Sequence, residues 1–238
     1  MQNAFPGIYP IRDAFVSCHL LVDGDQCALV DTGLTPLIRF GLKRQMRSLG
    51  LRPQALKAVF LTHGHLDHTG NADWIQRWSG APVYVHREDR RHLAGTFPYR
   101  GISRVCGWLE AAGRMLFRFR PPARVQFFAD DEMLPVLSGW RVVHLPGHTD
   151  GHCGFFCEKT RLLLCGDLFA SYLSITHQPP GILNTSPLKL AASFRRVAEL
   201  NPEFMICNHY DQLDPADLRR EFQRLIQRDK KGAGADSR

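Results

Sequence analysis

Thr62-His63-Gly64-His65-Leu66-Asp67-His68 is the stretch of this sequence that decides what can be built around it. Three imidazoles and one carboxylate follow the short apolar segment 58–61. Imidazole nitrogen and carboxylate oxygen are ligands that zinc and iron(II) accept. His63 and His65 can turn to one side of an irregular loop, while Asp67 and His68 reach a neighbouring point. The stretch therefore predicts a metal site able to hold two ions.

Three further candidate ligands occur in similar surroundings, each directly after an apolar segment of the length of a β-strand. They are His148 after 142–145, Asp167 after 162–165 and His209 after 204–207. Functional residues gather at strand ends along one edge of a layered α/β fold. We therefore expect these three side chains to lie beside the first motif.

Hydrophobic patterning and turn signals predict two sheets with helices on their outer faces. The expected strands are 15–22 and 27–30, joined by an Asp-Gly turn, then 58–61, 83–85, 125–128, 140–145, 154–157, 162–165 and 204–207. The expected helices are 35–49, 71–78, 103–119, 186–200 and 215–227. We expect one domain over residues 1–229 and a frayed tail over 230–238.

The ordered set of motifs resembles the metallo-β-lactamase superfamily, in particular its glyoxalase II-like and lactonase-like members. The shared marks are His63-x-His65-x-Asp67-His68, Pro146-Gly147-His148-Thr149, Gly166-Asp167, the late His209, and Asp31-Thr32-Gly33 after the opening hairpin. The resemblance covers roughly residues 15–210 in the right order. It implies an α/β fold, a four-layer αβ/βα sandwich of two mixed β-sheets with helices on the outer faces.

The resemblance also implies roles for these residues. His63, His65 and His148 would bind the first metal, Asp67, His68 and His209 the second, and Asp167 would bridge the two. The ions would be two Zn²⁺ per chain, with iron or manganese as alternatives. Asp67 would also be catalytic, orienting a metal-bridging hydroxide and carrying a proton to the leaving group. Asp31 would brace a ligand by hydrogen bonding, the alternative being a plain turn aspartate.

The implied reaction is hydrolysis of a small ester, lactone or thioester. The segment after Asp167 lacks the Gly-Arg pair typical of glyoxalase II. A lactonase usually has a tyrosine where this chain has Ala170, and Tyr172 is the nearest substitute. Tyr172 and His177 are the candidates for lining the substrate pocket. The aromatic- and arginine-rich segment 96–124 could cap that pocket and favour an anionic substrate with an apolar part, or it could be a structural helix pair.

Several rival functions stay open. A mono-iron persulfide dioxygenase would use His63, His148 and Asp167. A phosphodiesterase or nuclease of the same superfamily would suit the formal charge of +7. A metal-binding protein without activity is a third alternative. The Asp31-Thr32-Gly33 triplet also matches aspartic proteases, but their chemistry needs two such carboxylates and the chain has one triplet.

Composition constrains the setting of the protein. The N-terminus lacks the basic and apolar regions of a secretory signal, and no apolar run reaches the roughly 18 residues of a membrane span. Seven cysteines, an odd number, fit reduced thiols packed in the core. We therefore expect a cytoplasmic monomer or homodimer with no membrane partner, and a small molecule rather than nucleic acid as its substrate.

Overall fold

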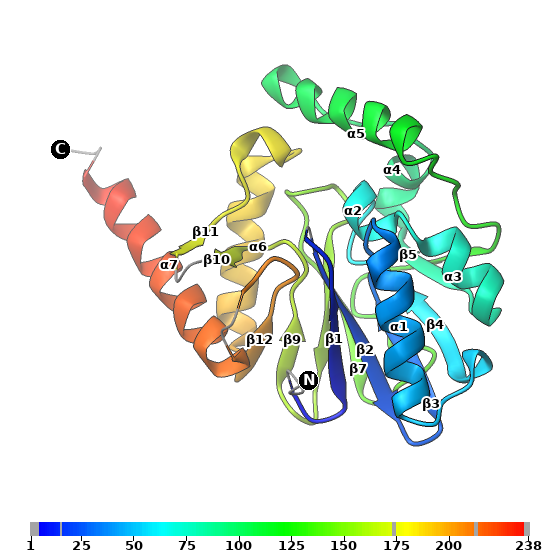
Figure 1. The fold of residues 1–238 in the computed structure, drawn as a ribbon. Coiled ribbons are helices and arrows are strands. Elements are labelled where there is room, and N and C mark those ends of the chain that lie inside the picture. Colours follow the sequence, from blue (N-terminus) through cyan, green and yellow to red (C-terminus); the bar gives the residue numbers. More distant parts are fainter. Residues whose placement is uncertain (1–4, 15, 173–174, 212–213, 236–238) are drawn as a thin grey trace.

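The first sheet begins as an antiparallel meander and continues with parallel strands (Figure 1). In this computed structural model, residues 5–14, 16–172, 175–211 and 214–235 are described, the last seven by their backbone alone. The strands follow the order β1 (Ile8–Arg12), β2 (Ser17–Asp23), β3 (Gln26–Val30), β4 (Leu56–Phe60), β5 (Val83–His86) and β6 (Val125–Phe128). The expected β2–β3 hairpin is confirmed, with Gly24 at a φ of 60° in its turn.

The second sheet is smaller and also mixed. Its order is β12 (Phe204–Ile206), β9 (Leu162–Leu164), β8 (Cys153–Cys157) and β7 (Trp140–His144). The strands β7, β8 and β9 pair antiparallel, and β12 joins β9 in parallel. A separate hairpin of β10 (Ala170–Tyr172) and β11 (Ile175–His177) follows β9. Neither this hairpin nor β1 was expected from the sequence.

Helices cover the outer face of each sheet (Figure 1). The α-helices are α1 (Pro36–Ser48), α2 (Leu66–Thr69), α3 (Ala72–Ser79), α4 (Arg90–Leu93), α5 (Arg104–Leu116), α6 (Pro187–Leu200) and α7 (Pro215–Ala235). Single 3₁₀ turns are η1 (Pro53–Ala55), η2 (Arg87–Asp89), η3 (Gly101–Ser103) and η4 (Gly181–Leu183). The helices α1 and α3 lie on the first sheet, and α6 and α7 on the second. The four-layer sandwich is thereby confirmed.

Strand β3 shows how the sequence produces these layers. Ala28 and Val30 belong to the core between the sheets, whereas Cys27 and Leu29 belong to the core under α1 and α3. Because successive side chains of a strand point to opposite faces, a strand buried on both faces needs a continuous apolar run. The segment Cys27–Val30 supplies that run, and all four side chains are buried.

Two local features differ from expectation. The metal motif contains one turn of helix, α2, where an irregular loop was expected. The helix α7 runs to Ala235 and so continues through most of the expected tail, whose residues 236–238 lie outside the described residues. All seven cysteines are buried and unpaired, as expected for core thiols. In the described part of the chain, no helix has both the length and the hydropathy that crossing a bilayer requires.

Candidate metal centre

The seven predicted ligands converge at the edge where four strands end. His63 and His65 follow β4, and α2 carries Asp67 and His68. The other three each follow one strand, and they are His148 after β7, Asp167 after β9 and His209 after β12. The convergence expected from strand ends is therefore what the structure shows.

One oxygen lies at the middle of this cluster. Asp167 Oδ2 is 3.0 Å from His209 Nε2 and 3.3 Å from His68 Nε2. It is also 3.5 Å from His148 Nε2 and 3.8 Å from His63 Nε2. A single carboxylate thus lies within reach of four imidazoles from three separate segments.

The ligand atoms fall into overlapping groups whose members all lie within 4.8 Å of one another. The groups are His63 with His65 and His148, Asp67 with His68 and His209, and Asp167 with His63 and His68. The first two match the sets that the resemblance implies for two metals. The third joins them, because it takes His63 from one set and His68 from the other.

The chemistry of the cluster suits a divalent cation. His68 Nε2, His148 Nε2 and Asp167 Oδ1 are buried, and none has a hydrogen-bond partner within the described residues. Buried polar atoms without partners are unfavourable, so these atoms call for a ligand. Burial, reinforced by the neighbouring His68, holds the pKa of His63 well below its usual value. The neutral imidazole that results is the form that binds metal.

In the other half of the cluster, nearby carboxylates raise the pKa values of the histidines. Burial lowers the pKa of His68, but Asp167, Asp67 and Asp31 outweigh it and raise that pKa well above its usual value. The pKa of Asp167 lies well below its usual value, because His209 and His68 together outweigh the effect of burial. Without a bound cation, protons on His68 and His209 would balance these carboxylates, so metal binding there must displace protons.

Each imidazole is fixed from its outer side. His63 Nδ1 lies 3.0 Å from Thr62 Oγ1, and His148 Nδ1 lies 3.0 Å from Asn184 Oδ1. In the same way, His209 Nδ1 is 3.3 Å from the Tyr172 hydroxyl, and His65 Nε2 contacts the Tyr99 hydroxyl. Such outer partners select the tautomer and the ring orientation of a ligating histidine.

Asp31 joins two of the segments that meet at the centre, the motif Thr62–His68 and the segment that ends in His209. Its carboxylate accepts hydrogen bonds from Thr62 N (2.8 Å), Thr62 Oγ1 (2.8 Å), Asn208 Nδ2 (2.6 Å) and His68 Nδ1 (3.0 Å). The side chain is fully buried. Because His68 Nδ1 donates to Asp31, a neutral His68 ring would carry its lone pair on Nε2, the nitrogen that would bind a cation. The contact is the one expected of a residue that braces a ligand.

A second buried aspartate was not anticipated from the sequence. Asp89 accepts hydrogen bonds from Gly64 N (2.8 Å), Thr149 Oγ1 (2.7 Å) and Gly151 N (2.7 Å). Burial raises its pKa to about 6, although these hydrogen bonds oppose the shift. Asp89 thereby ties the loop of His63 and His65 to the loop of His148. Its sequence surroundings, Arg-Glu-Asp-Arg-Arg, suggest only a solvated charged segment.

His152 positions the central carboxylate through the backbone. Its Nε2 accepts the Asp167 amide hydrogen at 3.0 Å, and its Nδ1 donates to Leu145 O at 2.8 Å. Gly166 has a φ of 58°, and a Cβ there would lie 2.6 Å from His152 Nε2. Only glycine therefore allows this close approach. These contacts make His152 a support of the segment that carries Asp167.

The sequence pattern of the metallo-beta-lactamase superfamily matches residues 11–209. The chain belongs to this superfamily. It is 28% identical to the probable metallo-hydrolase YflN of Bacillus subtilis over 188 residues, 73% of this chain and 71% of that one. It is also 28% identical to the hydroxyacylglutathione hydrolase GloC of Haemophilus influenzae over 208 residues, 84% of this chain and 87% of that one.

Solved structures agree on the fold. A metallo-beta-lactamase family protein from Thermus thermophilus superposes with a TM-score of 0.72 at 24% identity, covering 97% of this chain and 82% of that one. Another neighbour was described in a di-iron-bound form. It has a TM-score of 0.61 at 26% identity and covers 84% of this chain and 90% of that one.

Of the two residues expected to line the pocket, only Tyr172 contacts the cluster of candidate ligands. Its ring is 40% exposed beside His209. His177 pairs with Ala170 across the β10–β11 hairpin, and its Nδ1 donates to Gln178 O. Within the described residues, no contact joins His177 to the cluster.

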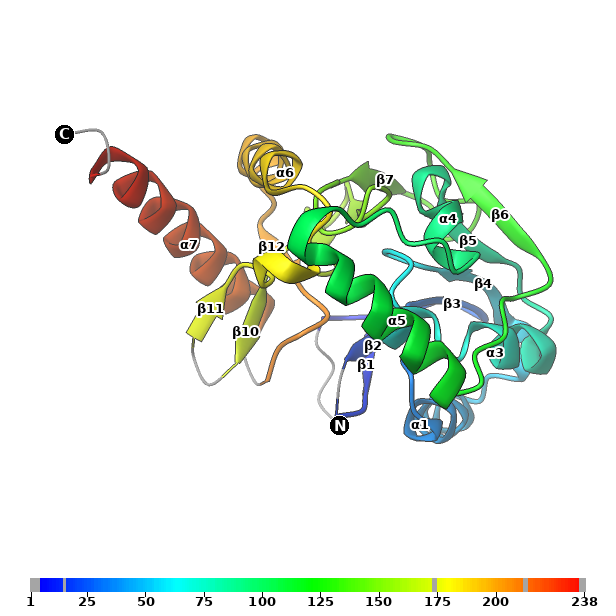
Figure 2. The ribbon, with the colours of Figure 1, turned by 90° about the horizontal axis from the view of Figure 1, so that it is seen from above.

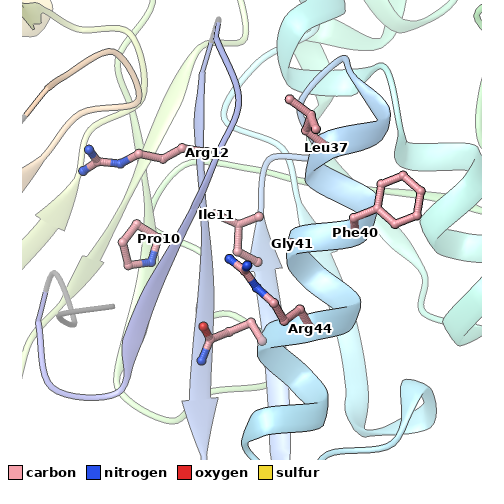
Figure 3. A pocket seen from close by; sticks show the side chains of 8 residues that line it. Pro10, Ile11, Arg12, Leu37, Phe40, Gly41 and Arg44 are labelled. Atoms are coloured by element: carbon pink, nitrogen blue, oxygen red, sulfur yellow. The ribbon is translucent and has the colours of Figure 1, made fainter.

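A cavity of about 540 Å³ lies away from the metal ligands, between β1 and α1 (Figure 3). Its walls include Leu37 and Phe40 of α1, with Arg12 at the end of β1 and Arg44 on the helix. They contain no histidine, cysteine or carboxylate. This cavity therefore lacks the groups for hydrolytic chemistry, which are concentrated in the cluster around Asp167.

Proposed function

We propose that this metallo-hydrolase holds two divalent cations, most simply zinc, and hydrolyses a small ester, lactone or thioester. The observation that carries the proposal is the pair of ligand groups on either side of Asp167 Oδ2. Every ligand of both groups is present and directed at the cluster. A single-metal enzyme would need only one of them.

The names of two related proteins support hydrolysis and a pair of metal ions. GloC of Haemophilus influenzae is a hydroxyacylglutathione hydrolase by name, and one structural neighbour holds two irons. These proteins show that similar chains perform hydrolysis and hold a metal pair. For this chain, the identity of the metal and the bond cleaved are our inference.

Bound cations would supply Lewis acidity and, at neutral pH, deprotonated water. His63, His65 and His148 would hold one cation, and Asp67, His68 and His209 the other, with Asp167 between them. The chain's own contribution is to aim the imidazole nitrogens inward and, through burial, to keep His63, His65 and His148 neutral. Asp67 would accept a proton at a carboxylate oxygen and pass it to the leaving group.

The exposure of the ligands indicates the side from which the substrate enters. The side chains of Asp67 and His209 are 29% and 20% exposed, whereas that of His148 is 2% exposed. Substrate would therefore approach past Asp67 and His209. The Tyr172 hydroxyl lies on this open side and can donate a hydrogen bond to a substrate oxygen.

The test is metal quantification on the purified protein, followed by a screen of ester, lactone, thioester and phosphodiester substrates on the same sample. Two cations per chain and hydrolysis of an acyl substrate are expected, and His65→Ala should abolish turnover while circular dichroism stays unchanged. One iron per chain with persulfide-dependent oxygen uptake would instead support the dioxygenase. Full turnover in metal-free buffer would refute the proposal.

A further inference from the structure

The helix α5 has two very different sides. Its inner side is fixed to the metal motif, since Glu110 accepts the Leu66 amide hydrogen at 3.2 Å and Arg114 donates to Gly64 O at 3.0 Å. A Cβ at Gly113 would lie 2.9 Å from Leu66, which shows how closely α5 packs there. This side makes α5 a rigid part of the active-site wall.

The outer side of α5 is apolar and uncovered. Seen from above, the helix lies in front of the other elements with nothing over it (Figure 2). Six apolar side chains in and just before α5 are between 37% and 83% exposed, namely Ile102, Val105, Trp108, Leu109, Met115 and Leu116. At about 100° per residue, the five that lie within α5 fall on the side away from Glu110 and Arg114. A contiguous exposed face of this kind marks an interaction site.

The charges around this face have one sign. Arg100, Arg104, Arg118 and Arg120 are exposed, and within the described residues no ion pair or hydrogen bond engages their guanidinium groups. Glu110 is the one acidic residue between 96 and 124, and its side chain is only 12% exposed. An apolar stripe with tryptophan, bordered by arginines, is the pattern of a helix that lies in a membrane interface.

We propose that α5 docks on the surface of an anionic lipid bilayer. The helix lies parallel to the surface, with Trp108 and Met115 among the acyl chains and the arginines on the headgroup phosphates. A second copy of the chain is a poorer occupant, because two α5 helices face to face would bring arginines of both onto one seam without an exposed carboxylate to offset them. The absence of a spanning segment, which led us to expect no membrane partner, does not bear on a helix at the surface.

Docking in this way brings the metal centre to the membrane. Because Glu110 and Arg114 connect α5 to the backbone at Leu66 and Gly64, the centre lies directly behind the docked helix. A substrate carried in the bilayer would then need only a short path to the site.

Vesicle co-sedimentation of the protein tests the proposal. Vesicles of phosphatidylcholine with 30% phosphatidylglycerol should retain the protein, and vesicles of phosphatidylcholine alone should not. Trp108→Ser should weaken binding about tenfold, since tryptophan contributes a large apolar surface. Arg118→Gln should weaken it about fivefold, and only on anionic vesicles. Met115→Ser is compared with Met133→Ser, an equivalent change at a 53% exposed methionine outside α5, which should leave binding unchanged.

Several results would overturn the proposal. One is no retention by anionic vesicles, and another is retention that Trp108→Ser and Met115→Ser leave intact, which would indicate attraction by the overall charge alone. A third is a dimer in vesicle-free ultracentrifugation that Trp108→Ser dissociates, because α5 would then be an interface between copies. All variants keep Asp67 and the histidine ligands, so loss of vesicle binding with normal hydrolysis separates this proposal from the proposed function.

Discussion

Replacing Asp31 with asparagine tests whether the metal centre depends on a residue that touches no ligand group except His68. Asp31 has a φ of 60°, a left-handed conformation that asparagine tolerates and alanine does not. Asp31→Asn therefore changes the side chain without straining the backbone. The substitution removes the negative charge and converts one carboxylate oxygen into a donor.

The magnitude follows from the four hydrogen bonds to Asp31. With the amide NH₂ in place of Oδ2, two donors, His68 Nδ1 and Asn208 Nδ2, would face another donor. With the NH₂ in place of Oδ1, only the Thr62 amide would lose its acceptor. The second orientation should prevail, and one buried unsatisfied donor costs about 1–3 kcal/mol of stability. His68 keeps an acceptor, but a neutral one.

Affinity for the ion of the Asp67, His68 and His209 group should fall about 10- to 100-fold, as is usual when an outer partner of a ligand is lost. Competition titration of the metal-free protein with a chromophoric chelator measures both affinities, and urea unfolding measures stability. Asp25→Asn, in the exposed turn between β2 and β3, is the matched control. If Asp31→Asn binds both ions and unfolds like the wild type, Asp31 does not brace the centre.

Three further predictions concern the centre and the core. Gly166→Ala should lower stability by about 1–3 kcal/mol and reduce activity, because the new Cβ at a positive φ displaces His152 and thereby Asp167; a fully active, equally stable variant would contradict this. Burial, helped by Arg12, lowers the pKa of His19 to about 3. The stability that neutral His19 contributes to the fold is therefore fully present above pH 6.5 and is lost as the pH falls below that value. His19→Leu should therefore reduce the loss of unfolding free energy between pH 7.5 and pH 5 by about 2 kcal/mol, and His177→Leu, at an exposed position, should leave it unchanged. Chelation of the metal should lower the melting temperature, and the drop should be larger at pH 7.5 than at pH 5, because imidazoles bind cations only when neutral. A calorimetric melting temperature that does not change when chelator is added would argue against bound metal.

The candidate ligands could be proposed from the sequence because their chemistry is local. The stretch from His63 to His68 contains four potential metal ligands in six residues, and no common structural element needs that spacing. The strands were readable for a similar reason, since Cys27–Val30 and Leu162–Leu164 are apolar runs bounded by turn residues. The β10–β11 hairpin was missed because its strands have three residues each and carry no clear alternation.

The bracing residues could not be found in this way, because their partners are distant in the chain. Asp89 bonds to Gly64 and Gly151, which are 25 and 62 positions away. Glu110 reads as one charge on an amphipathic helix, yet it is turned inward onto Leu66. Nothing local distinguishes such residues from surface charges, because only the packing of the layers decides which carboxylates lose water.

The residue types and their order along the chain thus determined the superfamily, the layered fold and the choice of the seven candidate ligands. Folding in three dimensions decided which nitrogen of each imidazole faces Asp167, which side chains hold it there, and which side of α5 remains exposed. The physical reason is the separation along the chain of the residues that set each property. Ligand chemistry and strand alternation are properties of a few consecutive residues, whereas burial and hydrogen-bond partnership depend on segments that meet only when the two sheets pack together.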